Sequence, residues 1–77
     1  MFEQIKNLLI ETANVDANMI TPSARLKEDL LIDSLYAVEL ILELETTYDI
    51  KIEWETMQNL KTVEDVCNLI NEKTKNR

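Results

Sequence analysis

The sequence predicts an all-α fold: a small four-helix bundle of three main helices and one short helix, with a long packed loop between the first two. Apolar residues recur at helical spacing in residues 2–13 and 34–48, and again from Thr62 onward. Residues 49–52 alternate in polarity but are too isolated to pair as a strand. A chain of 77 residues has room for one small core, so we expect residues 1–77 to form a single domain.

The composition argues against several functional classes. The chain has no His, the commonest general base and metal ligand, and we expect neither an enzyme nor a metal site. Its single Cys cannot form an internal disulfide, which suits a reducing compartment. The first residues do not resemble a signal peptide, and no apolar stretch approaches the roughly 20 residues that span a bilayer. We therefore expect a cytoplasmic monomer without membrane insertion.

Negative charge is concentrated in the middle of the chain. The net charge is −7, and residues 28–60 alone carry −8, with nine acidic residues and one basic residue, while the remainder sums to +1. Such a field repels nucleic acid and attracts a basic patch on a protein partner. The alternative is that the acidity only keeps a small domain soluble.

The first helix is expected over residues 2–13, with Asn14 as a left-handed terminator in the role that Gly usually takes. Its apolar arc is formed by Phe2, Ile5, Leu8, Leu9 and Ala13. Residues 15–32 then form a connection that is too apolar for a solvated linker. We expect this loop to pack against the helices through its apolar side chains, namely Met19, Ile20, Leu26, Leu30, Leu31 and Ile32.

The second helix, residues 34–48, begins where either Asp33 or Ser34 can accept hydrogen bonds from the free N–H groups of the first turn. At 100° per residue, one arc forms a core stripe of Ala37, Leu40, Ile41, Leu44 and Tyr48. A second, apolar and acidic face lies on the side of Ser34 and includes Leu35, Val38, Glu39, Leu42 and Glu45. This face is either a docking surface beside Ser34 or a further buried side of the helix.

The remaining chain is expected to form an extended link, a short helix and a last helix. The link over residues 49–52 brings Ile50 and Ile52 to the core, and residues 54–60 form the short helix, with Trp54 as a partly buried lid. Thr62 begins the last helix, with Asp65 completing an imperfect capping box. Its apolar arc contains Val63, Val66, Cys67, Leu69 and Ile70. The cysteine is therefore interpreted as a small core residue rather than a reactive thiol.

Asp33-Ser34-Leu35, followed by Val38-Glu39-Leu40 and Tyr48-Asp49-Ile50, resembles the acyl carrier protein family. The resemblance covers nearly the whole chain, including Ile20-Thr21-Pro22 in the loop and Thr62-Val63-Glu64-Asp65-Val66 at the start of the last helix. In that family the Ser of Asp-Ser-Leu carries 4′-phosphopantetheine, covalently attached from coenzyme A. The resemblance implies that Ser34 does so here, in a non-catalytic carrier of acyl groups held as thioesters.

The resemblance also implies partners and two further sets of residues. The partners are a phosphopantetheinyl transferase and acyl-handling synthases and transferases with basic patches, in fatty-acid, polyketide or related lipid biosynthesis. We expect them to dock on a face formed by Asp33, Leu35, Val38, Glu39, Leu42 and Glu45. We expect the bundle to shelter the acyl chain among Leu40, Leu44, Ile52, Leu60 and Val66.

The chain departs from fatty-acid carriers at three places. They usually have a Gly where Leu31-Ile32 lie, an acidic residue where Tyr36 lies, and often a Pro near Glu53. These departures leave room for a carrier of a specialised pathway, with an amino-acyl or peptidyl carrier as one alternative, although Asp33 often gives way to His in that class. An unmodified helical adaptor is the other alternative. A hydrolytic Ser34 is disfavoured because a His base and a Gly-rich turn are both missing.

Overall fold

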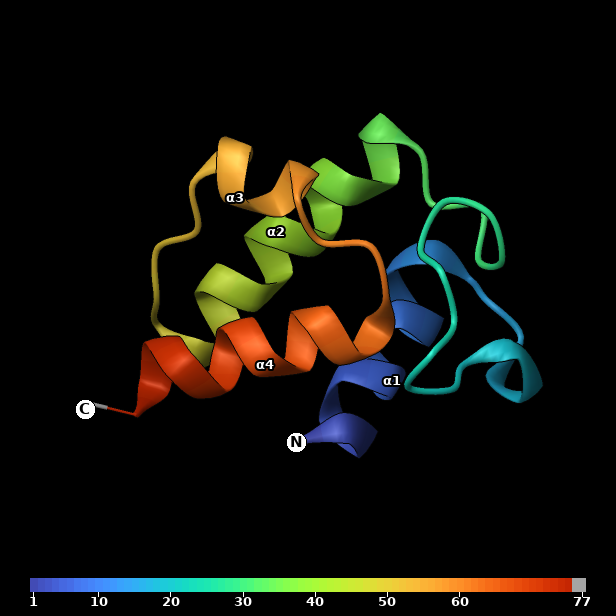
Figure 1. Ribbon diagram of the computed structural model, residues 1–77, viewed down its shortest axis with the longest axis horizontal. Coiled ribbons are helices and arrows are strands. Elements are labelled where there is room, and N and C mark those ends of the chain that lie inside the picture. The colour runs from blue at the N-terminus through green and yellow to red at the C-terminus, as the bar shows by residue number, and fades with distance from the viewer. Residues whose placement is uncertain (76–77) are drawn as a thin grey trace.

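The computed structural model describes residues 1–75, which contain four α-helices and one short 3-10 helix (Figure 1). The elements in order are α1 (Phe2–Ala13), η1 (Ala17–Met19), α2 (Ser34–Tyr48), α3 (Trp54–Gln58) and α4 (Val63–Thr74). Within this described part no strand is present, only an isolated antiparallel bridge between Arg25 and Thr62. The predicted all-α class is confirmed. The short helix was predicted over residues 54–60, whereas α3 ends at Gln58, so the prediction was two residues too long.

The core lies where α1 meets α2 and α4. The helix α1 packs against both of the other two, and the side chains without solvent contact recur three or four residues apart in each helix. These fully buried residues are Ile5, Leu9, Leu40, Leu44, Val63, Val66 and Ile70. Cys67 joins them, and burial raises the pKa of its thiol. The apolar arcs predicted for the three main helices therefore form the core.

The chain ends α1 and α2 without glycine. Asn14 after α1 and Asp49 after α2 both adopt the left-handed conformation, with φ of 54° and 53°. Asn and Asp tolerate this region better than other non-glycine residues because their short polar side chains can bond locally. The prediction for Asn14 is confirmed, and Asp49 does the same at the end of α2. Within residues 1–75, every helix is too short or too polar to cross a membrane.

The long loop between α1 and α2 is held against the segment that precedes α4. The N–H of Leu26 donates to the carbonyl of Lys61 at 2.8 Å, and the N–H of Val63 donates to the carbonyl of Ala24 at 3.0 Å. Figure 1 shows these two segments side by side, in teal and orange. The loop buries Ile20, Ala24, Leu26, Leu30 and Ile32. The prediction of a packed loop is therefore confirmed for most of its apolar residues.

Two apolar residues of the loop are exceptions, and the prediction for them was wrong. Met19 is 50% exposed and Leu31 is 75% exposed. Leu31 has a positive φ of 56°, which turns the chain so that the side chains before and after it point inward while its own points to solvent. Hydrophobicity alone did not indicate this turn.

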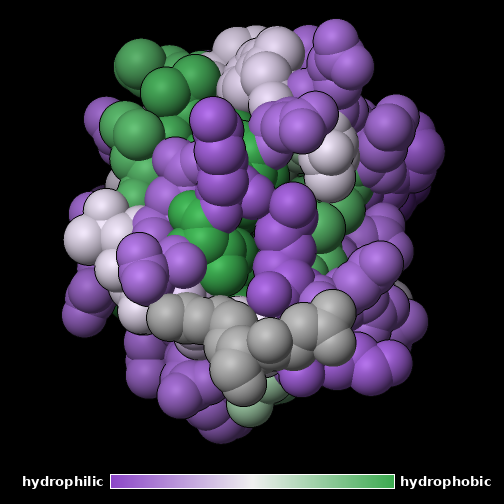
Figure 2. All heavy atoms as spheres, turned by 90° about the vertical axis from the view of Figure 1, so that its left-hand side faces the viewer, coloured by the Kyte–Doolittle hydropathy of each residue, from purple (hydrophilic) through white to green (hydrophobic). Residues whose placement is uncertain are grey.

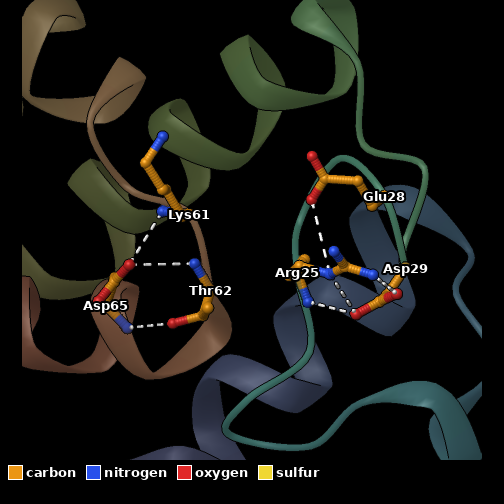
Figure 3. A network of polar contacts seen from close by, with 6 residues as sticks. All are labelled: Arg25, Glu28, Asp29, Lys61, Thr62 and Asp65. Carbon is orange, nitrogen blue, oxygen red and sulfur yellow. Dashed lines mark hydrogen bonds and ion pairs between the residues drawn. The ribbon is translucent and has the colours of Figure 1, made fainter.

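Figure 3 shows two polar clusters that fix the loop and the start of α4. In the loop, the Arg25 guanidinium lies 3.7 Å from the Glu28 carboxylate and 3.3 Å from that of Asp29. The Arg25 N–H also donates to Asp29 Oδ2 at 2.8 Å, and this bond is the main cause that lowers the pKa of Asp29. The second cluster joins Asp65 to Thr62 and Lys61. Together the two clusters fix both segments through polar contacts.

Candidate modification site at the start of α2

Asp33 is the residue that caps α2. Its backbone is extended, and its Oδ1 accepts hydrogen bonds from Leu35 N at 3.0 Å and Tyr36 N at 3.2 Å. Its carbonyl accepts from Ala37 N at 2.9 Å, as the first bond of the helix. The sequence left open whether Asp33 or Ser34 fills this role, and the geometry assigns it to Asp33. Two of the N–H groups that could have faced a phosphate are therefore already satisfied by a carboxylate.

Ser34 is the first residue of α2 and is exposed. No hydrogen bond to another described residue involves its hydroxyl. A serine next to a helix start normally serves as the cap, but here the neighbouring aspartate takes that role. The hydroxyl is thus free for a covalent bond, with little structural consequence for the helix.

A partly open cavity of about 250 Å³ lies beside Ser34, where the loop, the start of α2 and α3 come together. Its apolar lining comes from Leu26, Ile32, Ala37, Trp54, Met57 and Leu60. Lys27, Asp33 and Gln58 contribute polar groups. A chain attached to the Ser34 oxygen would find apolar surface directly next to its attachment point.

The cavity coincides only in part with the residues expected to shelter the acyl chain. Leu60 lines it, but Leu40, Leu44, Ile52 and Val66 are buried in the core and do not. Those four belong to the packed core, and their expected role in sheltering an acyl chain stays a prediction. Ile32 and Met57 line the cavity without having been expected there, because the contact between loop and α3 that forms it leaves no periodic signal. Trp54, expected as a partly buried lid, lines the cavity but is 42% exposed.

The apolar residues of the face beside Ser34 are exposed. Leu35 is 66%, Leu42 56% and Val38 43% exposed, so α2 is not buried on this side. Glu39 and Asp33 are exposed as well. Figure 2 views the end of the molecule where α2 and α4 finish; hydrophobic atoms are visible in a patch at its upper left and on the floor of a central hollow, with hydrophilic side chains around both. The arrangement leaves apolar and acidic groups together at the surface of α2.

Glu45 differs from the other residues of this expected face. It is half-buried, and its Oε2 accepts a hydrogen bond from Ile52 N at 2.9 Å. At 20° from Ser34 on the helical wheel it borders the core stripe, so its carboxylate reaches the link that folds back from α2. This contact gives Glu45 a structural role in the link, which the helical arithmetic did not indicate.

A shallow groove between α1 and α2 places further acidic groups near this face. It is lined by Glu11, Thr12, Glu39, Leu42 and Glu43. Glu43, four residues after Glu39 and about 40° from it on the helical wheel, lies on the same groove. The negative field around the start of α2 extends from the helix to the end of α1.

Comparisons with known proteins show the family of the chain. A family model described as a phosphopantetheine attachment site matches residues 3–70. The acyl carrier protein of Onion yellows phytoplasma (strain OY-M) is 46% identical over 74 residues, which cover 96% of this chain and 97% of that one. That of Petrotoga mobilis is 37% identical over 73 residues, covering 95% and 86%. A solved structure of a candidate acyl carrier protein from Mycobacterium tuberculosis has a TM-score of 0.79 at 39% identity, covering 87% of this chain and 89% of that one.

The fold and the site define a phosphopantetheine-attachment domain, a class that holds its cargo on a covalently bound arm. The chain belongs to the acyl carrier protein family. Its function is to carry acyl groups, and its cofactor is covalently attached 4′-phosphopantetheine. The residues present fit that group, because a free hydroxyl lies at the edge of an apolar cavity with Lys27 on its lining.

Proposed function

We propose that Ser34 is the attachment point of the 4′-phosphopantetheine arm and that this chain acts as a carrier without catalytic activity of its own. The observation that supports the proposal is that Asp33, and not Ser34, caps the start of α2. Asp33 satisfies the N–H groups of the first turn, while the hydroxyl of Ser34 stays exposed and without a partner among the described residues. When bound, the arm supplies a thiol that holds an acyl group as a thioester.

Each part of the site then has a physical role. Asp33 keeps the first turn of α2 formed whether or not Ser34 is modified, because its contacts do not involve the serine side chain. The apolar groups of Ile32, Met57 and Leu60 line the cavity and keep water away from an apolar chain that enters it. We place the sheltered part of the acyl chain there, in a cavity formed by the loop and α3 rather than among the packed core residues expected from the sequence.

The exposed face of α2 is the surface on which we place the partner enzymes. Asp33, Leu35, Val38, Glu39 and Leu42 lie on it, and Glu45 contributes charge from its edge. Partners with basic patches, namely the phosphopantetheinyl transferase and acyl-handling synthases and transferases, suit the −8 charge of residues 28–60. We propose that residues 1–77 work as one monomeric domain in the cytoplasm, without nucleic-acid partners, in fatty-acid, polyketide or related lipid biosynthesis.

The experiment that tests the attachment point is intact-mass measurement after co-expression with a phosphopantetheinyl transferase. The wild-type protein should gain the mass of one arm, and Ser34→Ala should gain none. Ser23→Ala, a matched change at an exposed serine in the loop, should be modified like the wild type. A full mass gain in Ser34→Ala would refute the attachment point. A wild-type protein that is never modified would favour the unmodified adaptor instead.

The same preparation tests the cavity. The arm-bearing protein loaded with acyl groups of increasing length should melt at rising temperature, because each methylene that leaves water contributes roughly 0.8 kcal/mol when buried. The rise should level off once the cavity of about 250 Å³ is full. A melting temperature independent of chain length would exclude sheltering in this cavity.

A further inference from the structure

Leu31 combines two features that do not favour folding. Of the three non-glycine residues with positive φ in residues 1–75, Asn14 and Asp49 are types that tolerate the left-handed region, whereas Leu31 is not. Its apolar side chain is also the most exposed of the large hydrophobic residues in the described part. Backbone strain of this kind persists mainly at functional sites. Neither packing nor backbone preference explains a leucine here.

The position of Leu31 relates it to the proposed attachment point. It lines a hollow together with Lys27, Ile32, Asp33 and Ser34. It also lines a second hollow that contains Met19 and Tyr36. Leu31 thus stands between the surface that leads to the Ser34 hydroxyl and an exposed apolar region of the loop. A protein that covers the serine from this side must also cover Leu31.

We propose that Leu31 is a docking contact for the phosphopantetheinyl transferase that modifies Ser34, and that it inserts into an apolar pocket of that enzyme. The inference rests on the proposed function of Ser34. Tyr36 and Met19, both exposed, widen the contact on the far side of Leu31. An exposed leucine becomes favourable in a complex where its surface leaves water. In this complex, burial of the Leu31 side chain offsets the unfavourable backbone conformation and the exposed apolar surface that Leu31 has in the free protein.

Charge selects this occupant over two others. A second copy of the chain would bring two segments of −8 together, and a membrane with anionic lipids would face the same repulsion. An enzyme with basic groups around an apolar pocket meets both the charge and the apolar surface.

The test uses substitutions that separate the backbone of Leu31 from its side chain. Leu31→Asn and Leu31→Gly both suit the left-handed backbone and remove the apolar contact, whereas Leu31→Met keeps an apolar side chain. The rate of arm transfer from coenzyme A is measured by intact mass at varied concentrations of the unmodified carrier. Thermal unfolding of each unmodified variant is measured in parallel.

We expect Asn and Gly at this position to raise KM for the carrier about fivefold, equivalent to about 1 kcal/mol, with kcat unchanged. Their melting temperatures should equal that of the wild type or exceed it by up to about 5 °C. Leu31→Met should keep KM within about twofold of the wild type. The expected result is thus a weaker substrate that is at least as stable.

Three outcomes would overturn the inference: an unchanged KM for Leu31→Asn, a KM for Leu31→Met raised as much as that for Leu31→Asn, or a clear fall in melting temperature in both left-handed-compatible variants. In each of these cases the wild-type protein is still modified, so the attachment point stands. Absence of modification in the wild type itself refutes the proposed function, and the inference with it.

Discussion

The starts of α2 and α4 are both capped by side-chain oxygens, but the two caps leave different groups free. At α4, Thr62 Oγ1 accepts from Asp65 N at 3.2 Å, and Asp65 Oδ2 accepts from Thr62 N at 3.1 Å and Lys61 N at 3.0 Å. Both side chains of this capping box are engaged. At α2, Asp33 alone accepts from the first turn, and the hydroxyl beside it makes no such bond. The side chains at the start of α4 are engaged with each other, whereas the start of α2 leaves an exposed hydroxyl without a hydrogen bond to a described residue.

The difference matters for stability, because the two helix starts depend on different residues. The start of α4 also anchors the loop, because Val63 N and Glu64 N bond to loop carbonyls. Loss of the α4 cap would therefore loosen both the start of α4 and the loop that is bonded to it. The start of α2 depends on Asp33 rather than on Ser34, so the proposed modification of Ser34 would not remove a cap. The free hydroxyl is therefore compatible with a stable α2.

The largest effect that would test this comparison is the stability difference between two alanine substitutions. Thr62→Ala removes one half of the capping box and should lower the free energy of unfolding by about 1–2 kcal/mol. Ser34→Ala removes a hydroxyl without partners and should change it by less than about 0.5 kcal/mol. Denaturant unfolding of the two unmodified variants measures both. Equal losses would mean that Ser34 does share the cap of α2.

A smaller effect concerns the charge around the two helices. Glu39→Lys, on the exposed face of α2, should slow modification of Ser34 about three- to tenfold by reducing electrostatic steering. The deficit should shrink as salt screens the field. The matched control is Glu72→Lys on α4, which changes the net charge equally at an exposed position. Glu43→Lys is a poorer control, because Glu43 lines the same groove as Glu39. Equal slowing by Glu39→Lys and Glu72→Lys would show that only total charge matters.

Periodicity was enough to predict the three main helices. The bounds expected for two of them, residues 2–13 and 34–48, coincide with α1 and α2, because each helix must present an apolar stripe to a core of three helices. The capping box of α4 was also predicted from Thr62 and Asp65. Local patterns of this kind depend on few neighbours, and the sequence contains them directly.

What the sequence did not indicate depends on contacts between distant segments. Asp33 and Ser34 are both good caps, and only the geometry distinguishes them. Leu31 was expected to be buried because it is apolar, but a positive φ between two buried residues turns it outward. The cavity beside Ser34 requires α3 to approach the loop, and Glu45 needs the link to fold back. None of these contacts has a short-range signature.

The smallest predicted effect is the pH dependence of the α4 start. Hydrogen bonds from the N–H groups of Lys61 and Thr62 lower the pKa of Asp65 below its ordinary value of 3.8. A carboxyl whose pKa is lowered by folding contributes stability that is fully present above its unfolded pKa and is lost as pH falls through the folded one. Asp65→Asn has no such titration.

The difference in unfolding free energy between the wild type and Asp65→Asn should therefore be constant at neutral and mildly acidic pH, and should shrink below about pH 4. We expect its total to be no more than about 1 kcal/mol, since the side chain is only partly buried. Other carboxylates with lowered pKa, such as Asp29, titrate in both proteins and cancel in the difference. A difference that persists unchanged down to about pH 2 would show that the ionised carboxylate of Asp65 is not what stabilises α4, and the contrast between the two helix starts would then rest on Thr62 alone.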